Sequence, residues 1–287
     1  MTALAGAVTR QVELPQGTLR YREVGQGDPI VFIHGLLVNA TLWDGVAARL
    51  ARTHRCILPD LPMGAHAIPM NPHADLSPPG MARLVADFLG ALALDEVTLV
   101  ANDTGGAISQ LLVTSQPERI GRLVLTNCDA FENFLPPFFR PLQWLARVPG
   151  ALTVAIQLMR SAAIRHSALG FGLLAEHPIP AETLAGWVRP ALADPAVRRD
   201  ARKLLRGISK RQTLQAAERL PGFERPTLLA WAPADRFFRF SFAERLLERF
   251  PNGRLQRIED ARTFVSLDQP ERLAELIEEF LREGAER

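Results

Sequence analysis

The chain has few cysteines and no long apolar run, and both scarcities narrow its class. Cys56 and Cys128 are its two cysteines, too few for a disulfide framework or a metal site. We therefore expect a reducing compartment and no metal ion. No run approaches the roughly 20 apolar residues that span a bilayer. The segment from Met1 to Gln16 lacks the basic start and apolar core of a signal peptide. The sequence predicts a cytoplasmic protein with no membrane partner.

Neither positive nor negative charge is in large excess. Lys and Arg number 33, Asp and Glu number 31, and the net charge is +2. This balance gives no reason to expect a nucleic acid or an acidic surface as partner. The 287 residues, 47% of them hydrophobic, can bury a large core. They suit one catalytic domain with an insertion, or two small domains. We expect a small-molecule substrate, and a homodimer is an open option.

Strand-like and helix-like segments alternate in two parts of the chain. Apolar, β-branched runs predict strands at 12–14, 18–24, 29–33, 56–60, 97–102, 122–126, 226–231 and 254–258. Helical spacing predicts helices at 41–52, 80–94, 107–112, 242–250 and from 268 onward. Residues 130 to about 222 carry helical patterns without a convincing strand. This alternation predicts a mostly parallel sheet with helices on both faces, interrupted by a helical insertion.

Polar side chains follow five of the predicted strands. In parallel sheets, functional groups gather at the carboxyl ends of the strands. The residues at these ends are His34, Asp60, Asp103, Asp129 and Asp235.

The segment around Asp103 carries the most specific pattern. A strand that turns abruptly into a helix crowds its own backbone, so small residues are needed two positions to each side of the turn residue. Ala101 and Gly105 meet this need. The pattern is that of a nucleophile elbow, with Asp103 in the place usually held by Ser. The alternative is that Asp103 is a helix N-cap at an ordinary strand–helix turn.

Together these motifs resemble those of the α/β-hydrolase family, over roughly residues 10–135 and 222–283. The matching features, in order, are His34-Gly35 after the third strand, the elbow, Asp235 after the seventh strand, and Asp268-Gln269-Pro270-Glu271 opening the last helix. The resemblance implies an α/β-hydrolase fold with a mostly parallel eight-stranded sheet flanked by helices. It also implies a core domain at 1–130 and 222–287 and an inserted α-helical cap at 131–221.

An Asp at the elbow narrows the resemblance to haloalkane dehalogenases, fluoroacetate dehalogenases and epoxide hydrolases. It implies that Asp103 opens an alkyl halide or epoxide and forms an ester, with Asp235 as the supporting acid. The backbone amides of Leu36 and Thr104 would form the oxyanion hole. A carboxylate with an ordinary pKa of about 3.9 is ionised at neutral pH and needs no base to activate it. This chemistry needs no cofactor.

The chain departs from the family at the general base. In Ala261-Arg262-Thr263-Phe264, Thr263 stands where the family has His. Threonine is not a base at neutral pH, and losing a positioned base costs about 10²–10⁴-fold in rate. Leu36 and Thr104 also stand where dehalogenases commonly hold the halide with Asn and Trp. Epoxide hydrolases use cap tyrosines, whereas Tyr21, the single tyrosine, lies in the N-terminal hairpin.

Several residues are candidates for the missing functions. His66 and His73 lie on the loop after the fourth strand, which borders the pocket in this family; either is an alternative base or a solvated loop residue. Asp129 is a second acid, or a turn or helix-cap residue. Phe131, in the insertion, is a candidate pocket-wall residue.

We therefore expect a cofactor-free hydrolase that uses Asp103 as its nucleophile. Two alternatives follow from Thr263. Asp103 acts as a base or electrostatic group in a lyase, isomerase or cyclase of secondary metabolism, or the chain is a non-catalytic ligand binder.

Overall fold

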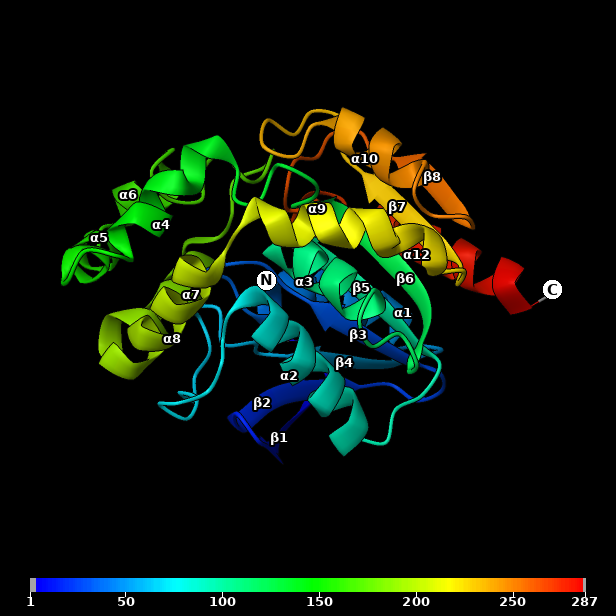
Figure 1. Cartoon of the computed structure of the whole chain (residues 1–287), viewed down its shortest axis with the longest axis horizontal. Helices are drawn as coiled ribbons and strands as arrows, with labels where there is room; N and C mark the ends of the chain where they lie inside the picture. The colour runs from blue at the N-terminus through cyan, green and yellow to red at the C-terminus, as the bar shows by residue number, and fades with distance from the viewer. Residues whose placement is uncertain (1–3, 286–287) are drawn as a thin grey trace.

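A single twisted sheet of eight strands forms the centre of the molecule (Figure 1). The structure, a computed structural model, describes residues 4–285. The strands are β1 (Val8–Leu14), β2 (Gly17–Val24), β3 (Pro29–Ile33), β4 (Arg55–Pro59), β5 (Val97–Asp103), β6 (Ile120–Cys128), β7 (Thr227–Trp231) and β8 (Gly253–Arg257). Their spatial order is β1-β2-β4-β3-β5-β6-β7-β8. β2 is antiparallel to β1 and to β4, and all other neighbours are parallel. The predicted fold class is confirmed.

Helices cover both faces of this sheet. They are α1 (Asp44–Leu50), α2 (Pro78–Ala91), α3 (Thr104–Val113), α10 (Phe240–Leu247), α11 (Val265–Asp268) and α12 (Pro270–Ala285). Side chains of β3 alternate between the faces, as the strand period requires. Ile30 and Phe32 join a buried cluster with α1 and α12. Val31 and Ile33 join the opposite cluster with α2 and α3. Both faces are thus apolar, which explains the continuous apolar run of this strand.

Six α-helices and two short 3₁₀ helices, Pro137–Phe139 and Leu220–Gly222, lie between β6 and β7. The α-helices are α4 (Arg140–Leu145), α5 (Ala151–Leu158), α6 (Ala162–His166), α7 (Ala181–Ala193), α8 (Pro195–Gly207) and α9 (Lys210–Arg219). No strand occurs between Asp129 and Pro226, a stretch that the structure describes in full. In Figure 1, α4 to α8 lie to one side of the sheet, whereas α9 runs over α3. The helical insertion is confirmed; its boundary as a domain stays a prediction. Nowhere in residues 4–285 is there a helix long and apolar enough to cross a membrane.

The start of the last helix differs from the prediction. We expected Asp268 to open this helix, but Asp268 ends the short helix α11, and α12 begins at Pro270. Its carboxylate accepts hydrogen bonds from the backbone amides of Glu176 (2.8 Å), His177 (3.0 Å) and Arg262 (3.0 Å). An ionised carboxylate forms strong hydrogen bonds with backbone amides, and here the amides come from two separate segments of the chain. Asp268 therefore fastens the insertion to the loop after β8.

The first testable prediction concerns the close approach of α3 to β3. A Cβ atom at Gly105 would lie 2.4 Å from the carbonyl oxygen of His34 and 2.7 Å from that of Ile33. We expect Gly105→Ala to lower the free energy of unfolding by about 1–3 kcal/mol, because backbone atoms must move apart. Urea denaturation measures this.

Gly186, within α7, is the matched control. A Cβ there meets nothing within 4 Å, so Gly186→Ala should raise stability by about 0.5–1 kcal/mol through helix propensity. Equal effects of the two substitutions would contradict the predicted crowding at the turn.

Candidate active site

Asp103 lies at a sharp turn between β5 and α3. Its φ of 54° and ψ of −132° place it outside the conformations usual for non-glycine residues. The turn directs the carboxyl group toward the segment after β3, where a Cβ atom at Gly35 would lie 2.3 Å from Oδ2. The side chain is almost buried, with the residue 9% exposed. Glycine at position 35 is therefore what makes room for this carboxyl group.

Backbone amides hold the Asp103 carboxyl group. The amide of Thr104 donates to Oδ1 at 2.7 Å, and the amide of Leu36 is a further donor. These are the two amides predicted for the oxyanion hole. Asp103 is also the N-cap of α3, so the elbow and the N-cap interpretations describe the same residue. Among residues 4–285, no Arg, Lys or His side chain forms a hydrogen bond or ion pair with it.

This environment changes the expected ionisation of Asp103. Burial raises its pKa to about 7, against the lowering effect of the Thr104 and Leu36 amides. The expectation of an ordinary pKa of about 3.9 is therefore wrong, because water that would solvate the charge is excluded. Near neutral pH, part of the population carries a proton on this group.

Asp235 and Thr263 form a second part of the site. Asp235 follows β7, and its Oδ1 accepts from the amides of Phe237 (2.7 Å) and Phe238 (3.1 Å). Its Oδ2 accepts from the hydroxyl of Thr263 at 2.9 Å. Burial raises the pKa of Asp235 to about 6. The fully buried Thr263 thus donates to the acid, as a family His would, but offers no basic atom.

Asn102, which sequence reasoning did not single out, connects these parts. Its Nδ2 atom donates to the carbonyl oxygen of Thr263 at 2.7 Å, to the hydroxyl of Thr126 at 2.9 Å and to the carbonyl oxygen of Asn127 at 3.0 Å. One amide thus joins β5, β6 and the loop after β8. The available signal was a polar residue directly before Asp103, near the end of a mostly apolar strand.

Asp129 lies close to Asp103. The Thr104 hydroxyl oxygen is 3.2 Å from Oδ2 of Asp129 and 3.4 Å from Oδ1 of Asp103. Asp129 is fully buried, and its Oδ1 has no hydrogen-bond partner among the described residues. Burial, together with the charge of Asp103, raises the pKa of Asp129 well above its usual range. Its neighbour Cys128 is buried too, and burial raises the pKa of that thiol, so it is not a ready nucleophile.

His34, His66 and His73 either have partners other than Asp103 or are exposed. His66 is buried, not solvated as one alternative had it, and its Nε2 lies 3.3 Å from Oδ2 of Asp200 on α8. His73 is exposed. His34 has its Nδ1 2.9 Å from the carbonyl oxygen of Gly35, and its Nε2 accepts from the amide of Leu61 at 2.9 Å. Burial lowers the pKa of His34 to about 4, so it is neutral. None of the three hydrogen-bonds to Asp103. A base role for His66 or His73 stays a prediction.

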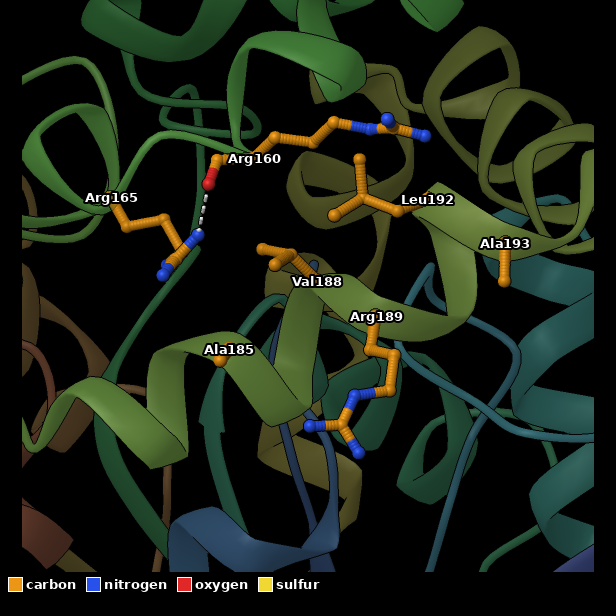
Figure 2. A pocket seen from close by; sticks show the side chains of 7 residues that line it. All are labelled: Arg160, Arg165, Ala185, Val188, Arg189, Leu192 and Ala193. Carbon is orange, nitrogen blue, oxygen red and sulfur yellow. Dashed lines mark hydrogen bonds between the residues drawn. The ribbon is translucent and has the colours of Figure 1, made fainter.

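Phe131 and the insertion contribute apolar surfaces whose role in the site is a prediction. The guanidinium carbon of Arg245 lies 4.1 Å from the centroid of the Phe131 ring. A cavity of about 360 Å³ opens between α7 and the segment that joins α5 to α6, and Figure 2 shows Arg160, Arg165 and Arg189 around it. A second cavity, of about 280 Å³, is lined in part by Phe171, His177 and Arg262. Asp103 lines neither of these two cavities.

The comparisons with known proteins agree with this fold. The model of the alpha/beta hydrolase fold family matches residues 28–270, so the chain belongs to that family. Haloalkane dehalogenase 2 of Mycobacterium tuberculosis is 27% identical, with 95% of this chain and 94% of that protein covered. A cis-3-alkyl-4-alkyloxetan-2-one decarboxylase of Shewanella oneidensis is 25% identical, with coverage of 92% and 85%.

Solved structures show the same architecture. A haloalkane dehalogenase from Agrobacterium tumefaciens superposes with a TM-score of 0.80 at 22% identity, covering 97% of each chain. An alpha/beta hydrolase fold protein from Burkholderia ambifaria gives a TM-score of 0.79 at 23% identity, covering 96% of this chain and 98% of that one. At these identities the likeness shows the fold.

The second prediction follows from the raised pKa of Asp103. A carboxyl group with a higher pKa in the folded than in the unfolded protein favours folding at low pH. That contribution is lost as pH rises from about 4 through about 7. Asp103→Asn removes this titration. It should raise the free energy of unfolding by about 2–3 kcal/mol more at pH 8 than at pH 5.

Urea denaturation of the wild type and the variant at both pH values measures this difference. Asp75→Asn serves as control, because Arg83 and the Ser77 amide hold the pKa of the exposed Asp75 below its usual value. A gain for Asp103→Asn that is the same at both pH values would contradict the raised pKa.

Proposed function

We propose that this protein is an enzyme in which Asp103 attacks a carbon atom of a small apolar electrophile and forms an ester with it. The reaction class is that of dehalogenases and epoxide hydrolases, and it needs no metal or organic cofactor. One observation carries the proposal: the carboxyl group sits at a strained turn, and the hydrogen bonds from Thr104 go to Oδ1. Oδ2 is then the oxygen left to attack.

The Thr104 amide also serves the later step of this chemistry. When an ester on Asp103 is hydrolysed, negative charge develops on the carbonyl oxygen, which would be Oδ1. Donors already in place stabilise that charge without reorganisation, the main electrostatic contribution in such sites. Haloalkane dehalogenase 2 of Mycobacterium tuberculosis, at 27% identity over nearly the full length, supports this reaction class.

A second candidate function is non-hydrolytic. Thr263, bonded to Asp235, offers no basic atom, so a reaction that needs no ester hydrolysis suits the site. The Shewanella oneidensis relative is named a decarboxylase, and decarboxylation is not hydrolysis. In this candidate Asp103 acts as a base or as an electrostatic group.

The third prediction tests covalent attack. We expect the wild type, incubated with a 1-bromoalkane or a terminal epoxide, to gain the mass of an alkyl group on the peptide that contains Asp103. The rate of adduct formation should rise with pH through about 7, because the ionised carboxylate is the nucleophile and burial raises its pKa to about 7. Intact-protein and peptide mass spectrometry follow the adduct.

Two variants complete the test. Asp103→Asn should form no adduct. Because Asn has nearly the same shape as Asp and keeps the Oδ1 acceptor, we expect the turn to stay intact. Thr263→His should clear a bromoalkane adduct faster than the wild type, with circular dichroism as the check on its folding. Product formation by a folded Asp103→Asn variant at the wild-type rate would eliminate the covalent role. Tight ligand binding without product or adduct in the wild type would instead identify a binder.

A further inference from the structure

The exposed large apolar side chains of this protein are concentrated in one part of the insertion. Among residues 4–283, such side chains outside the insertion's first half are Val8 on β1 and Leu214 on α9. Apolar residues scattered singly over a surface need no explanation, whereas a group of them marks an interaction site. We call the exposed residues between 137 and 170 the α4–α6 surface. Its large apolar members are Phe138, Trp144, Val148, Val154, Leu158 and Leu169.

The helix α5 is apolar on two opposite sides. Leu152 and Ile156, four residues apart, are buried, whereas Val154 and Leu158, also four apart, are exposed. The helix contains no charged residue. It packs against α7 and α8, and Figure 1 shows α4, α5 and α6 together at the end of the molecule opposite the C-terminus. A helix of this kind is ordinarily covered on both sides, and here the side of Val154 is open.

The same segment carries positive charge without negative charge. From residue 133 to residue 175 the chain contains no Asp or Glu. The acids at its two ends have partners, because Glu132 pairs with Arg245 and Glu176 pairs with Arg262. Four arginines lie within the segment, and none of them forms an ion pair with a carboxylate of the described residues: Arg140, Arg147, Arg160 and Arg165.

The cavity beside α7 combines the same two properties. Arg160, Arg165 and Arg189 line it, and its other lining residues are apolar (Figure 2). Nη1 of Arg165 donates to the carbonyl oxygens of Met159 (2.7 Å) and Arg160 (2.9 Å), while its Nε is buried without a partner among the described residues. Guanidinium groups bind phosphate oxygens with paired N–H donors. The cavity therefore suits an anionic group that is joined to an apolar one.

We propose that the α4–α6 surface binds the face of an anionic lipid bilayer. Its apolar side chains would enter the interfacial region, and its arginines would pair with lipid phosphates, as in protein segments that lie on membranes. A second copy of this chain fits less well, because two arginine-bearing surfaces without acids would repel each other. We expected no membrane partner from the lack of a spanning segment, but binding at a bilayer surface needs none.

Aromatic contacts join this surface to the candidate active site. The ring centroid of Phe138 lies 5.1 Å from that of Phe139 and 5.5 Å from that of Phe237. The backbone amide of Phe237 in turn donates to Asp235. Small apolar molecules, the substrate class proposed above, concentrate in bilayers because they leave water. An enzyme held at a bilayer surface would therefore lie close to its substrate.

The fourth prediction uses Trp144 as a reporter. Of the four tryptophans, Trp43, Trp187 and Trp231 are buried, whereas Trp144 is 65% exposed. Vesicles of phosphatidylglycerol and phosphatidylcholine should shift the fluorescence emission to shorter wavelength, because the indole leaves water. Lipids with brominated acyl chains should quench that emission. Vesicles of phosphatidylcholine alone should bind about 10-fold more weakly or worse, because the arginines lose their partners. Trp144→Phe should lose the shift.

Two pairs of variants separate the apolar and the charged contributions. Leu158→Gln and Arg160→Glu should each weaken sedimentation with anionic vesicles by about 10-fold or more. The matched controls are Leu214→Gln and Arg52→Glu, which change exposed residues outside the α4–α6 surface in the same way. Both controls should bind as the wild type does. The four residues are exposed, so the variants should fold, and circular dichroism checks this.

The outcomes decide the proposal without reference to catalysis. No emission shift with anionic vesicles, or equal binding of the two kinds of vesicle, would overturn it. Equal losses in Leu158→Gln and Leu214→Gln would overturn it too. A dimer that Leu158→Gln dissociates, in a protein that binds no vesicles, would assign the surface to a second copy. Asp103→Asn should bind vesicles as the wild type does, so a failure of the chemistry at Asp103 leaves this inference standing.

Discussion

A carboxyl group buried without a counter-cation is the constraint on which this site depends. Asp103 is held by backbone amides at a turn with positive φ, and every neighbour accommodates it. Gly35 leaves the space for its Oδ2, and Gly105 lets α3 approach the end of β3. The amides stabilise the charge only in part, so the pKa stays near neutrality instead of falling to that of an exposed carboxyl group.

Thr263, at the position where the resemblance implies a His, keeps the second part of the candidate site together. Thr263 keeps the hydrogen bond to Asp235, and Asn102 holds the loop backbone from the other side. Asp235 keeps two backbone amides as partners and so orders the turn after β7. Thr263 offers no basic atom at this position.

Local patterns predicted much of this molecule, and long-range contacts account for the rest. Apolar runs and the spacing around Asp103 located the strands and the turn, because strand period and backbone crowding are local properties. The burial of His66 against Asp200 was not predicted, because α8 reaches that loop from far along the chain. The bridge from Thr104 to Asp129 depends on the pairing of β5 with β6, in which Asp103 lies opposite Cys128. No sequence spacing encodes that register.

The measurement that tests the central claim most directly is a single turnover of an epoxide with excess enzyme in water enriched in ¹⁸O. Hydrolysis of an ester on Asp103 places a solvent oxygen in its carboxyl group, because water attacks Cγ. The account predicts that the peptide with Asp103 gains one ¹⁸O atom and that the diol first formed contains none. A diol that carries the label, with an unlabelled Asp103 peptide, would mean direct attack by water and would contradict the account.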